Sequence, residues 1–354
     1  ALRSQPGARS IRIRDLAAAA GKGELPAWYD SPFMRACRRE PVPYTPVWLM
    51  RQAGRYMPEY QQVRGETPFL DLCRNPELCR DVMLVAVEKL GVDAAIVFSD
   101  LPLILGPLGL NLEYTPGPEI DDPETLGYVY EAVRLTREAL APNLPLIGFA
   151  GSPFTLASYA IEGGSSRSYE HTKRLMYTDE GAWRALMGKL CRGVTRYLTR
   201  QIEAGAQCVQ LFDSWAGCLG PEDYRRYCQP YVREIIAGLP PEATVINFAT
   251  GKPALLPLIA EALDLLVRAK VVDLRLAALV REMGGVLRAV QGNLDPLVLL
   301  ADEETIRRRA AEVLAQAEGR PGHIFNLGHG VVKETPVENA IALVRAVHEL
   351  SARG

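Results

Sequence analysis

Short runs of apolar and β-branched residues alternate along the chain with longer segments whose apolar positions recur at helical spacing. The short runs predict eight strands: Val47–Met50, Ala94–Phe98, Leu144–Phe149, Cys208–Phe212, Thr244–Phe248, Val271–Leu274, Leu287–Val290 and His323–Leu327. The longer segments predict helices, among them Pro76–Leu90, Asp179–Ala204, Lys252–Ala269 and Glu303–Ala317. Because strand and helix alternate throughout, the pattern predicts a parallel sheet.

Eight such units in one chain favour a closed barrel over an open sheet. Most of the predicted strands are largely apolar, as strands covered on both faces should be. No internal repeat, low-complexity tract or linker divides the chain of 354 residues. We therefore expect an α/β fold, a single (β/α)8 TIM-type barrel over residues 31–354, preceded by a flexible basic extension over residues 1–30.

Two segments bear on targeting. The first fourteen residues contain four arginines and no acid, which favours a solvated basic tail over the alternative of an organelle transit remnant. The uncharged stretch Ala139–Ile161 is long enough to span a membrane, but its prolines and glycines indicate a helix end, a buried strand, a loop and a helix start. We expect a cytoplasmic protein, or a plastid or other organellar one if the extension is a transit remnant.

Composition narrows the classes of function. A net charge of −2 gives no general attraction to nucleic acid or to an acidic membrane, so any anion site must come from local arginines. The seven cysteines are scattered without C-x-x-C spacing, which argues against a disulfide framework or structural zinc. No two of the four histidines share a helical face, so we expect no metal.

Polar and glycine-rich residues follow most of the predicted strands. In a TIM-type barrel the reactive residues lie at the carboxyl ends of the strands. The segments found there are 51–56, 99–100, 151–155, 213–217, 291–296 and 328–330. The last two loops are also the usual phosphate site of such barrels, so a phosphorylated substrate is an alternative.

Arg51 and Arg55 lie four residues apart in a glycine-containing loop after the first predicted strand. Guanidinium groups suit bidentate binding of carboxylate or phosphate, so their placement favours an anion site over a pair of surface ion-pair partners. Asp100 ends the second strand and either faces the barrel mouth or forms a structural ion pair with one of these arginines. Residue types alone do not decide between these alternatives.

Three further side chains are candidates with a structural alternative of equal weight. The hydroxyls of Tyr159 and Ser214 either bind substrate or complete a loop network. His329 lies between two glycines, which allow close approach of a ligand, but a histidine that caps a turn would look the same.

The segment 46–60, Pro-Val-Trp-Leu-Met-Arg-Gln-Ala-Gly-Arg-Tyr-Met-Pro-Glu-Tyr, resembles the N-terminal signature of the uroporphyrinogen decarboxylase family. The resemblance runs from about residue 31 to the C-terminus. It continues through 98–100, 148–155 with Tyr159, 162–163, 212–217, 291–296 and 326–330.

The resemblance implies a homodimeric barrel without metal or organic cofactor. It implies a reaction that converts the four acetate side chains of uroporphyrinogen to methyls and gives coproporphyrinogen, with no nucleic acid or membrane partner. By motif position, Arg51 and Arg55 bind substrate carboxylates and Asp100 binds the pyrrole N–H groups. Supporting contacts fall to Gln52, Tyr159, Ser214 and His329, and the catalytic roles to Asp100, Arg51 and Tyr159.

One stretch departs from the family pattern, and two alternative functions remain open. At 264–275 the family's aromatic residue is replaced by Leu274, so the limits of the sixth strand are open.

Methyltransferases of the same superfamily are an alternative. They carry a His-x-Cys zinc motif after the fifth strand, where this chain has 247–251, Asn-Phe-Ala-Thr-Gly. A non-catalytic tetrapyrrole-binding protein would retain the same arginines.

Overall fold

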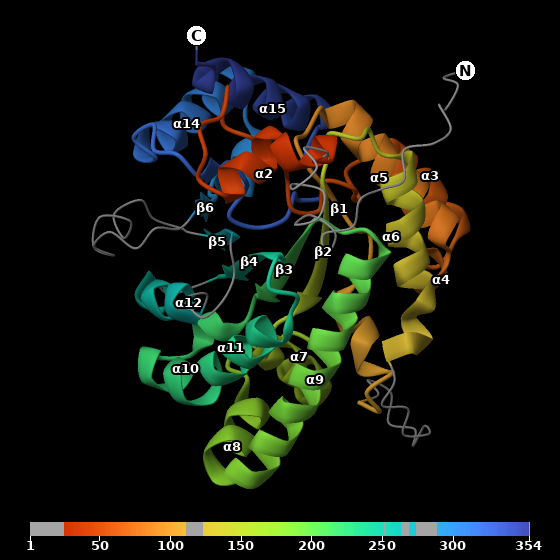
Figure 1. Cartoon of the computed structure of the whole chain (residues 1–354), viewed down its shortest axis with the longest axis vertical. Coiled ribbons are helices and arrows are strands. Elements are labelled where there is room, and N and C mark those ends of the chain that lie inside the picture. Colours follow the sequence, from red (N-terminus) through yellow and green to blue (C-terminus); the bar gives the residue numbers. More distant parts are fainter. Residues whose placement is uncertain (1–24, 111–122, 251–252, 263–268, 274–288, 354) are drawn as a thin grey trace.

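Seven parallel strands form one sheet whose order in space follows their order in the chain. The computed structural model describes residues 25–110, 123–250, 253–262, 269–273 and 289–353. In Figure 1 the strands lie at the centre and the helices surround them. The strands are β1 Ala95–Ile96, β2 Leu146–Gly151, β3 Cys208–Asp213, β4 Thr244–Ala249, β5 Ala269–Asp273, β6 Ala289–Gln291 and β7 His323–Ile324.

The sheet closes through residues 46–48, which occupy the eighth position. Val47 bridges Phe325, directly after β7, and Phe325 N–H donates to the Pro46 carbonyl at 2.8 Å. On the other side Asp93 N–H donates to the Val47 carbonyl at 2.8 Å, next to β1. The chain is therefore the predicted TIM-type barrel. The predicted strand Val47–Met50 is wrong in extent, because the backbone turns at once and Gln52 N–H bonds the Leu49 carbonyl.

The helices follow the predicted spacing closely where end signals are present. Helix α5 spans Pro76–Leu90 as predicted: the Asn75 side chain accepts from Leu78 N–H at its start, and Gly91 takes a left-handed conformation at its end. Helices α9 Glu180–Ala204 and α14 Glu303–Gln316 begin after the capping carboxylates of Asp179 and Asp302.

The remaining helices complete the outer ring. They are α2 Pro32–Cys37, α3 Pro58–Glu66, α4 Phe69–Arg74, α6 Gly127–Ala139, α7 Pro153–Glu162, α8 Glu170–Thr178, α10 Pro221–Tyr227, α11 Gln229–Gly238, α12 Leu256–Ala262 and α15 Val337–Ser351. Short 3-10 turns include η2 Ala27–Asp30 and η3 Leu101–Leu105. Trp28, within η2, is buried in the core.

The region after β4 differs from the prediction. The predicted helix Lys252–Ala269 is realised as a 3-10 turn, Pro253–Leu255, followed by α12, and Ala269 already belongs to β5. Pairing of Ala269 with Thr244 extends the sheet there, so tertiary pairing outweighs the helical pattern. Residues 1–24, 263–268 and 274–288 lie outside the described part, and with them most of the departing stretch 264–275.

The burial of the strand residues is that of a barrel whose strands are covered on both faces. Every residue of β2 and β4 is buried. The uncharged stretch Ala139–Ile161 divides into the end of α6, β2 and the start of α7, as its composition predicts. Among the described helices, none is long and apolar enough to cross a membrane.

Candidate active site

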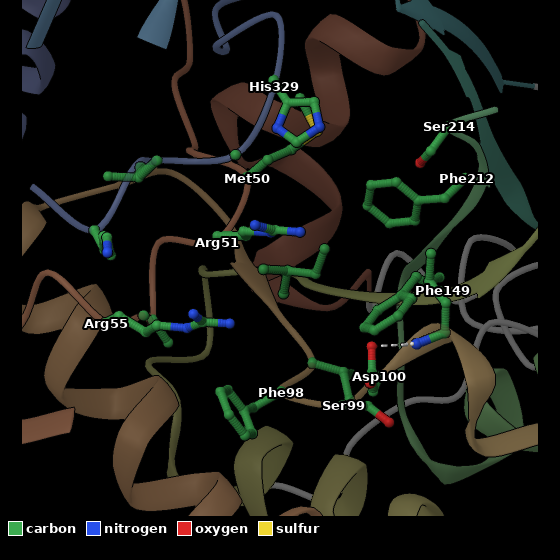
Figure 2. Close-up of a pocket in the computed structure, with 18 of the residues that line it drawn as sticks. Met50, Arg51, Arg55, Phe98, Ser99, Asp100, Phe149, Phe212, Ser214 and His329 are labelled. Carbon is green, nitrogen blue, oxygen red and sulfur yellow. Dashed lines mark hydrogen bonds between the residues drawn. The ribbon is translucent and has the colours of Figure 1, made fainter. Parts of the chain in front are cut away.

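A cavity of about 580 Å³ opens at the carboxyl ends of the barrel strands. Its walls come from the loops after residues 46–48, β1, β3 and β7, together with strand residues of β2 and β4 and helix α7. Six of the seven side chains predicted from the sequence line this cavity: Arg51, Arg55, Asp100, Tyr159, Ser214 and His329. Figure 2 shows five of them, and Arg51 and Arg55 point into the cavity from one side, opposite Phe149 and Phe212.

Neither arginine has an ion-pair partner among the described residues. No described carboxylate lies within 4.0 Å of either guanidinium, whereas many other arginines of the described chain meet that limit. The alternative of surface ion-pair partners therefore does not apply to Arg51 and Arg55. Two guanidinium groups that converge without a counter-ion form a site for an anionic ligand.

The loop that carries Arg51 is tightly constrained. Arg51 adopts a left-handed backbone conformation with φ of 62°, which is uncommon for a residue with a side chain. Gly54 allows the turn, because a Cβ there would lie 2.8 Å from the Arg51 carbonyl oxygen. Across the barrel closure, Val331 N–H donates to the Met50 carbonyl at 2.9 Å, so the loop after β7 holds the Arg51 loop in place.

Gly330 leaves the space through which the Arg51 side chain passes. A Cβ at Gly330 would lie 2.7 Å from Arg51 Cγ and 3.0 Å from Nε. The adjacent His329 lines the same part of the cavity and lies near Met50 in Figure 2. Gly330, one of the two glycines beside His329 in the sequence, thus makes room for the arginine side chain.

Asp100 lies at the cavity, and one hydrogen bond within the described residues anchors its carboxylate. Its Oδ1 accepts from Leu101 N–H at 2.9 Å, which starts the turn η3. No ion pair within 4.0 Å joins it to any described arginine or lysine, so the predicted alternative of a structural pair with Arg51 or Arg55 is wrong. Burial raises the Asp100 pKa, against the opposing effects of the Leu101 hydrogen bond and the Arg51 charge.

Tyr159 and Ser214 approach from neighbouring elements. Tyr159, in α7, stacks on Trp215 with ring centroids 4.0 Å apart. Burial raises the Tyr159 pKa, and the Asp100 charge adds to this effect, while Arg51 opposes it. The phenol therefore lies close to both charged groups. Ser214 follows β3, and its carbonyl accepts from the Thr250 hydroxyl.

Gln52 is not part of the cavity lining. Its side chain is 2% exposed and its amide bonds the main chain, accepting from Leu49 N–H at 3.2 Å and donating to the Ala94 carbonyl at 3.1 Å. These bonds join the Arg51 loop to β1. The geometry thus gives Gln52 a supporting position rather than the predicted substrate contact.

An aromatic wall and two charged residues at the rim also line the cavity and were not predicted from the sequence. Phe212 and Phe248 occupy paired positions on β3 and β4, with ring centroids 5.2 Å apart, and Phe149 packs edge-on against Phe212. Strand periodicity could have placed them inside the barrel, but only the register brings them together. Lys333 and Glu334, at the rim, form an exposed ion pair of 3.5 Å.

Groups of acidic, histidine and cysteine side chains that could hold a metal ion are absent from the described part of the chain. The cavity thus combines two guanidinium groups without a carboxylate partner among the described residues, the carboxylate of Asp100 and an aromatic wall. This arrangement can bind a large, flat, anionic molecule and stabilise a positive charge that develops next to the carboxylate.

Comparison with known proteins places these features in a family. Residues 29–350 match the family model described as uroporphyrinogen decarboxylase (URO-D). The chain is 48% identical over 340 residues to the uroporphyrinogen decarboxylase of Carboxydothermus hydrogenoformans, covering 90% of this chain and 96% of that protein. The same figures apply to the uroporphyrinogen decarboxylase of Sorangium cellulosum.

A solved structure supports the fold. A methyltransferase from Methanosarcina mazei superimposes with a TM-score of 0.74 and 20% sequence identity, over 90% of this chain and 98% of that one. At this level of identity the similarity concerns architecture alone.

Proposed function

The chain belongs to the uroporphyrinogen decarboxylase family, and from that premise we propose that its cavity converts the four acetate side chains of uroporphyrinogen to methyls, giving coproporphyrinogen. The observation that carries this proposal is the pair of cavity-facing guanidinium groups, Arg51 and Arg55, which have no carboxylate partner among the described residues. A substrate with eight carboxylates supplies the missing counter-ions. The aromatic wall of Phe149, Phe212 and Phe248 suits the faces of its pyrrole rings.

Arg51 and Arg55 bind substrate carboxylates and set the orientation of the ring that reacts. A guanidinium can hold both oxygens of a carboxylate through two parallel N–H bonds. The tight loop fixes Arg51 before the substrate arrives, so less conformational freedom is lost on binding. Lys333 adds a third cation at the rim, where its exposed bond to Glu334 is weak and easily exchanged.

Asp100 stabilises the charge that the reaction creates. Protonation of a pyrrole carbon makes the ring cationic, and the C–C bond to the acetate carboxyl then breaks as its electron pair moves into the ring. Carbon dioxide leaves, the exocyclic methylene takes up a proton to become a methyl, and the ring carbon returns its proton. Each cycle thus consumes one net proton, and a carboxylate that accepts the pyrrole N–H bonds attracts the cation more strongly than the neutral ring.

No organic cofactor is needed for this sequence of steps. A decarboxylation requires an electron sink, and the protonated pyrrole supplies it within the substrate. Tyr159, Ser214 and His329 provide hydrogen-bonding groups around the ring, and Tyr159 is placed near both Asp100 and Arg51. We place the reaction in the cytoplasm, in line with the prediction from the sequence.

Two other functions are disfavoured by specific residues. The barrel methyltransferases that the sequence resembles activate a thiol with zinc, but the described residues 247–250, at the end of β4, include no histidine or cysteine. A non-catalytic tetrapyrrole carrier would need the arginines but not a partly anchored carboxylate whose pKa is raised by burial.

The proposal is tested by incubating the protein with uroporphyrinogen without oxygen and separating the oxidised products by chromatography. We expect products with seven, six, five and finally four carboxylates. Arg51→Lys keeps the charge but loses the bidentate geometry, so we expect turnover to fall about a hundredfold with an unchanged melting temperature. Unchanged substrate with the wild-type protein would refute the function, and near-normal turnover of Arg51→Lys would remove Arg51 from the site.

A further inference from the structure

A fully buried carboxyl lies directly beneath the cavity and has no part in the proposed reaction. Asp213 ends β3, next to Ser214, and its side chain is 0% exposed. None of the described arginines, lysines or histidines lies within 4.0 Å of it. Burial raises the Asp213 pKa to about 7, while Thr155 and Tyr224 oppose the shift. An unpaired buried carboxyl is costly to the folded state, so a role in function would explain its presence.

Thr155 connects this carboxyl to the loop after β3. Its hydroxyl donates to Asp213 Oδ1 at 3.1 Å and accepts from Trp215 N–H at 3.3 Å. Thr155 is in α7 and is itself 0% exposed. The hydroxyl therefore joins helix α7 to the end of β3 at a point where no solvent can replace it.

Trp215 brings the same network to the cavity. Its ring stacks on Tyr159 at a centroid distance of 4.0 Å and an interplanar angle of 34°. The indole also contacts the ring of Tyr169, with centroids 5.2 Å apart, so two tyrosines pack against it. Tyr159 lies one helical turn after Thr155 on α7 and lines the cavity. The backbone bond at Trp215 and the ring stack thus both act on the position of the Tyr159 phenol.

We propose that Thr155, held by Asp213, is a positioning residue that sets Trp215 and through it the Tyr159 hydroxyl in the cavity. This inference rests on the proposed function, since it assigns Tyr159 a role in the reaction. The arrangement acts at a distance from the substrate: Asp213 and Thr155 are buried beneath the lining and do not belong to it. Helix α7 alone would leave the phenol free to change its rotamer, whereas the stack on a fixed indole restricts it.

Thr155→Val tests the inference, because valine keeps the shape and removes both hydrogen bonds. Thr155→Ser keeps the hydroxyl and is the matched control. We expect kcat with uroporphyrinogen to fall about ten- to a hundredfold in Thr155→Val and to stay within about threefold of wild type in Thr155→Ser. Melting temperatures show whether each variant is folded. If Thr155→Val does not fold, Trp215→Leu replaces it in the same comparison.

A double-mutant cycle separates positioning from general stability. If Thr155 acts through the Tyr159 hydroxyl, Thr155→Val should cost much less in a Tyr159→Phe background than in wild type, because the group it positions is already gone. An equal loss in both backgrounds would refute the inference, and so would a Tyr159→Phe variant with wild-type turnover.

A crystal structure of Thr155→Val gives a readout that does not depend on activity. We expect the Trp215 and Tyr159 rings to move by about 1 Å or to adopt new rotamers. Rings that keep their positions would overturn the inference even if the protein proved to act on another substrate. Absence of turnover in the wild type, with rings that move in the variant, would instead count against the proposed function alone.

Discussion

Arg51 shows how the site is built at the scale of a single residue. Its left-handed backbone conformation costs roughly 1 to 2 kcal/mol, and the residue that bears this cost is one that we assign to substrate binding. From this conformation the guanidinium points into the cavity. Neighbouring glycines at 54 and 330 make room for it.

Gly330→Ala should therefore impair substrate binding without unfolding the barrel. The added methyl would lie 2.7 Å from Arg51 Cγ, and the arginine has to adopt another rotamer to avoid it. We expect KM for uroporphyrinogen to rise about tenfold or more, measured by steady-state kinetics without oxygen. Gly220→Ala is the control, because a Cβ at Gly220 meets nothing within 4 Å. Equal KM values in the two variants would show that Gly330 does not restrict Arg51.

Asp100→Asn removes the charge from the cavity carboxylate while keeping its shape. Losing one preorganised electrostatic partner costs about 3 to 4 kcal/mol of transition-state stabilisation, so we expect turnover to fall roughly a hundred- to a thousandfold. The melting temperature should change little, since no ion pair is lost. Turnover and melting temperature, measured on one preparation, show whether Asp100 acts in catalysis or in stability. A stable, fully active Asp100→Asn variant would refute the mechanism.

The raised pKa of Asp100 predicts how activity falls on the acidic side of its pH profile. Burial raises the Asp100 pKa, so the carboxyl takes up a proton at a higher pH than an ordinary aspartate does. Activity that requires the charged form is present above that pKa and is lost as the pH falls through it. The residual activity of Asp100→Asn should lack this dependence.

At the scale of elements, the first barrel segment is held by a polar contact at the opposite end of the barrel from the cavity. Asp93, just before β1, accepts from Val47 N–H at 2.7 Å, the Tyr44 hydroxyl at 3.0 Å and the His348 ring at 2.8 Å. His348 belongs to α15. One carboxylate thus ties the closing segment to the C-terminal helix.

Asp93→Asn should destabilise the barrel and leave catalysis alone. The amide that replaces the Asp93 carboxylate would carry no charge, and its NH₂ group would face one of the donors that the carboxylate now accepts from. We therefore expect the free energy of unfolding to fall by about 2 to 4 kcal/mol. Denaturant unfolding measures this, with kcat expected to remain near wild type. Asp179→Asn is the control, because asparagine caps a helix as well as aspartate does. A variant as stable as that control would show that the contact contributes nothing.

At the scale of the whole molecule, the cavity lies at one end of the barrel. Six of the eight strand positions contribute residues to it, either from the strand itself or from the segment that follows the strand. Family resemblance predicts a homodimer with the barrel mouths near the contact. We expect sedimentation to give about twice the mass of one chain at micromolar concentration. A monomer under these conditions would contradict the prediction, while the activity assay would remain valid for the single barrel.

The sequence by itself determined the alternation of strands and helices, the barrel and most of the residues around its mouth. Periodicity and capping act within a few residues, so Asn75 and Gly91 sufficed to place both ends of α5. The sequence also showed which charged residues follow the apolar strands. Because the carboxyl ends of all barrel strands lie at the same end of the barrel, these residues could be assigned to one site.

Only the tertiary structure decided how these residues face one another. Barrel closure through the bridge at Val47 depends on pairing with Phe325, and whether a described carboxylate lies beside Arg51 or Arg55 depends on every neighbour in space. The hydrogen bond from the Gln52 amide to the Ala94 carbonyl, 42 residues away, leaves no local signal in the sequence. Likewise Thr155 and Asp213 are 58 residues apart and meet because α7 packs on β3. Contacts of this kind are set by register and packing, which local propensity does not encode.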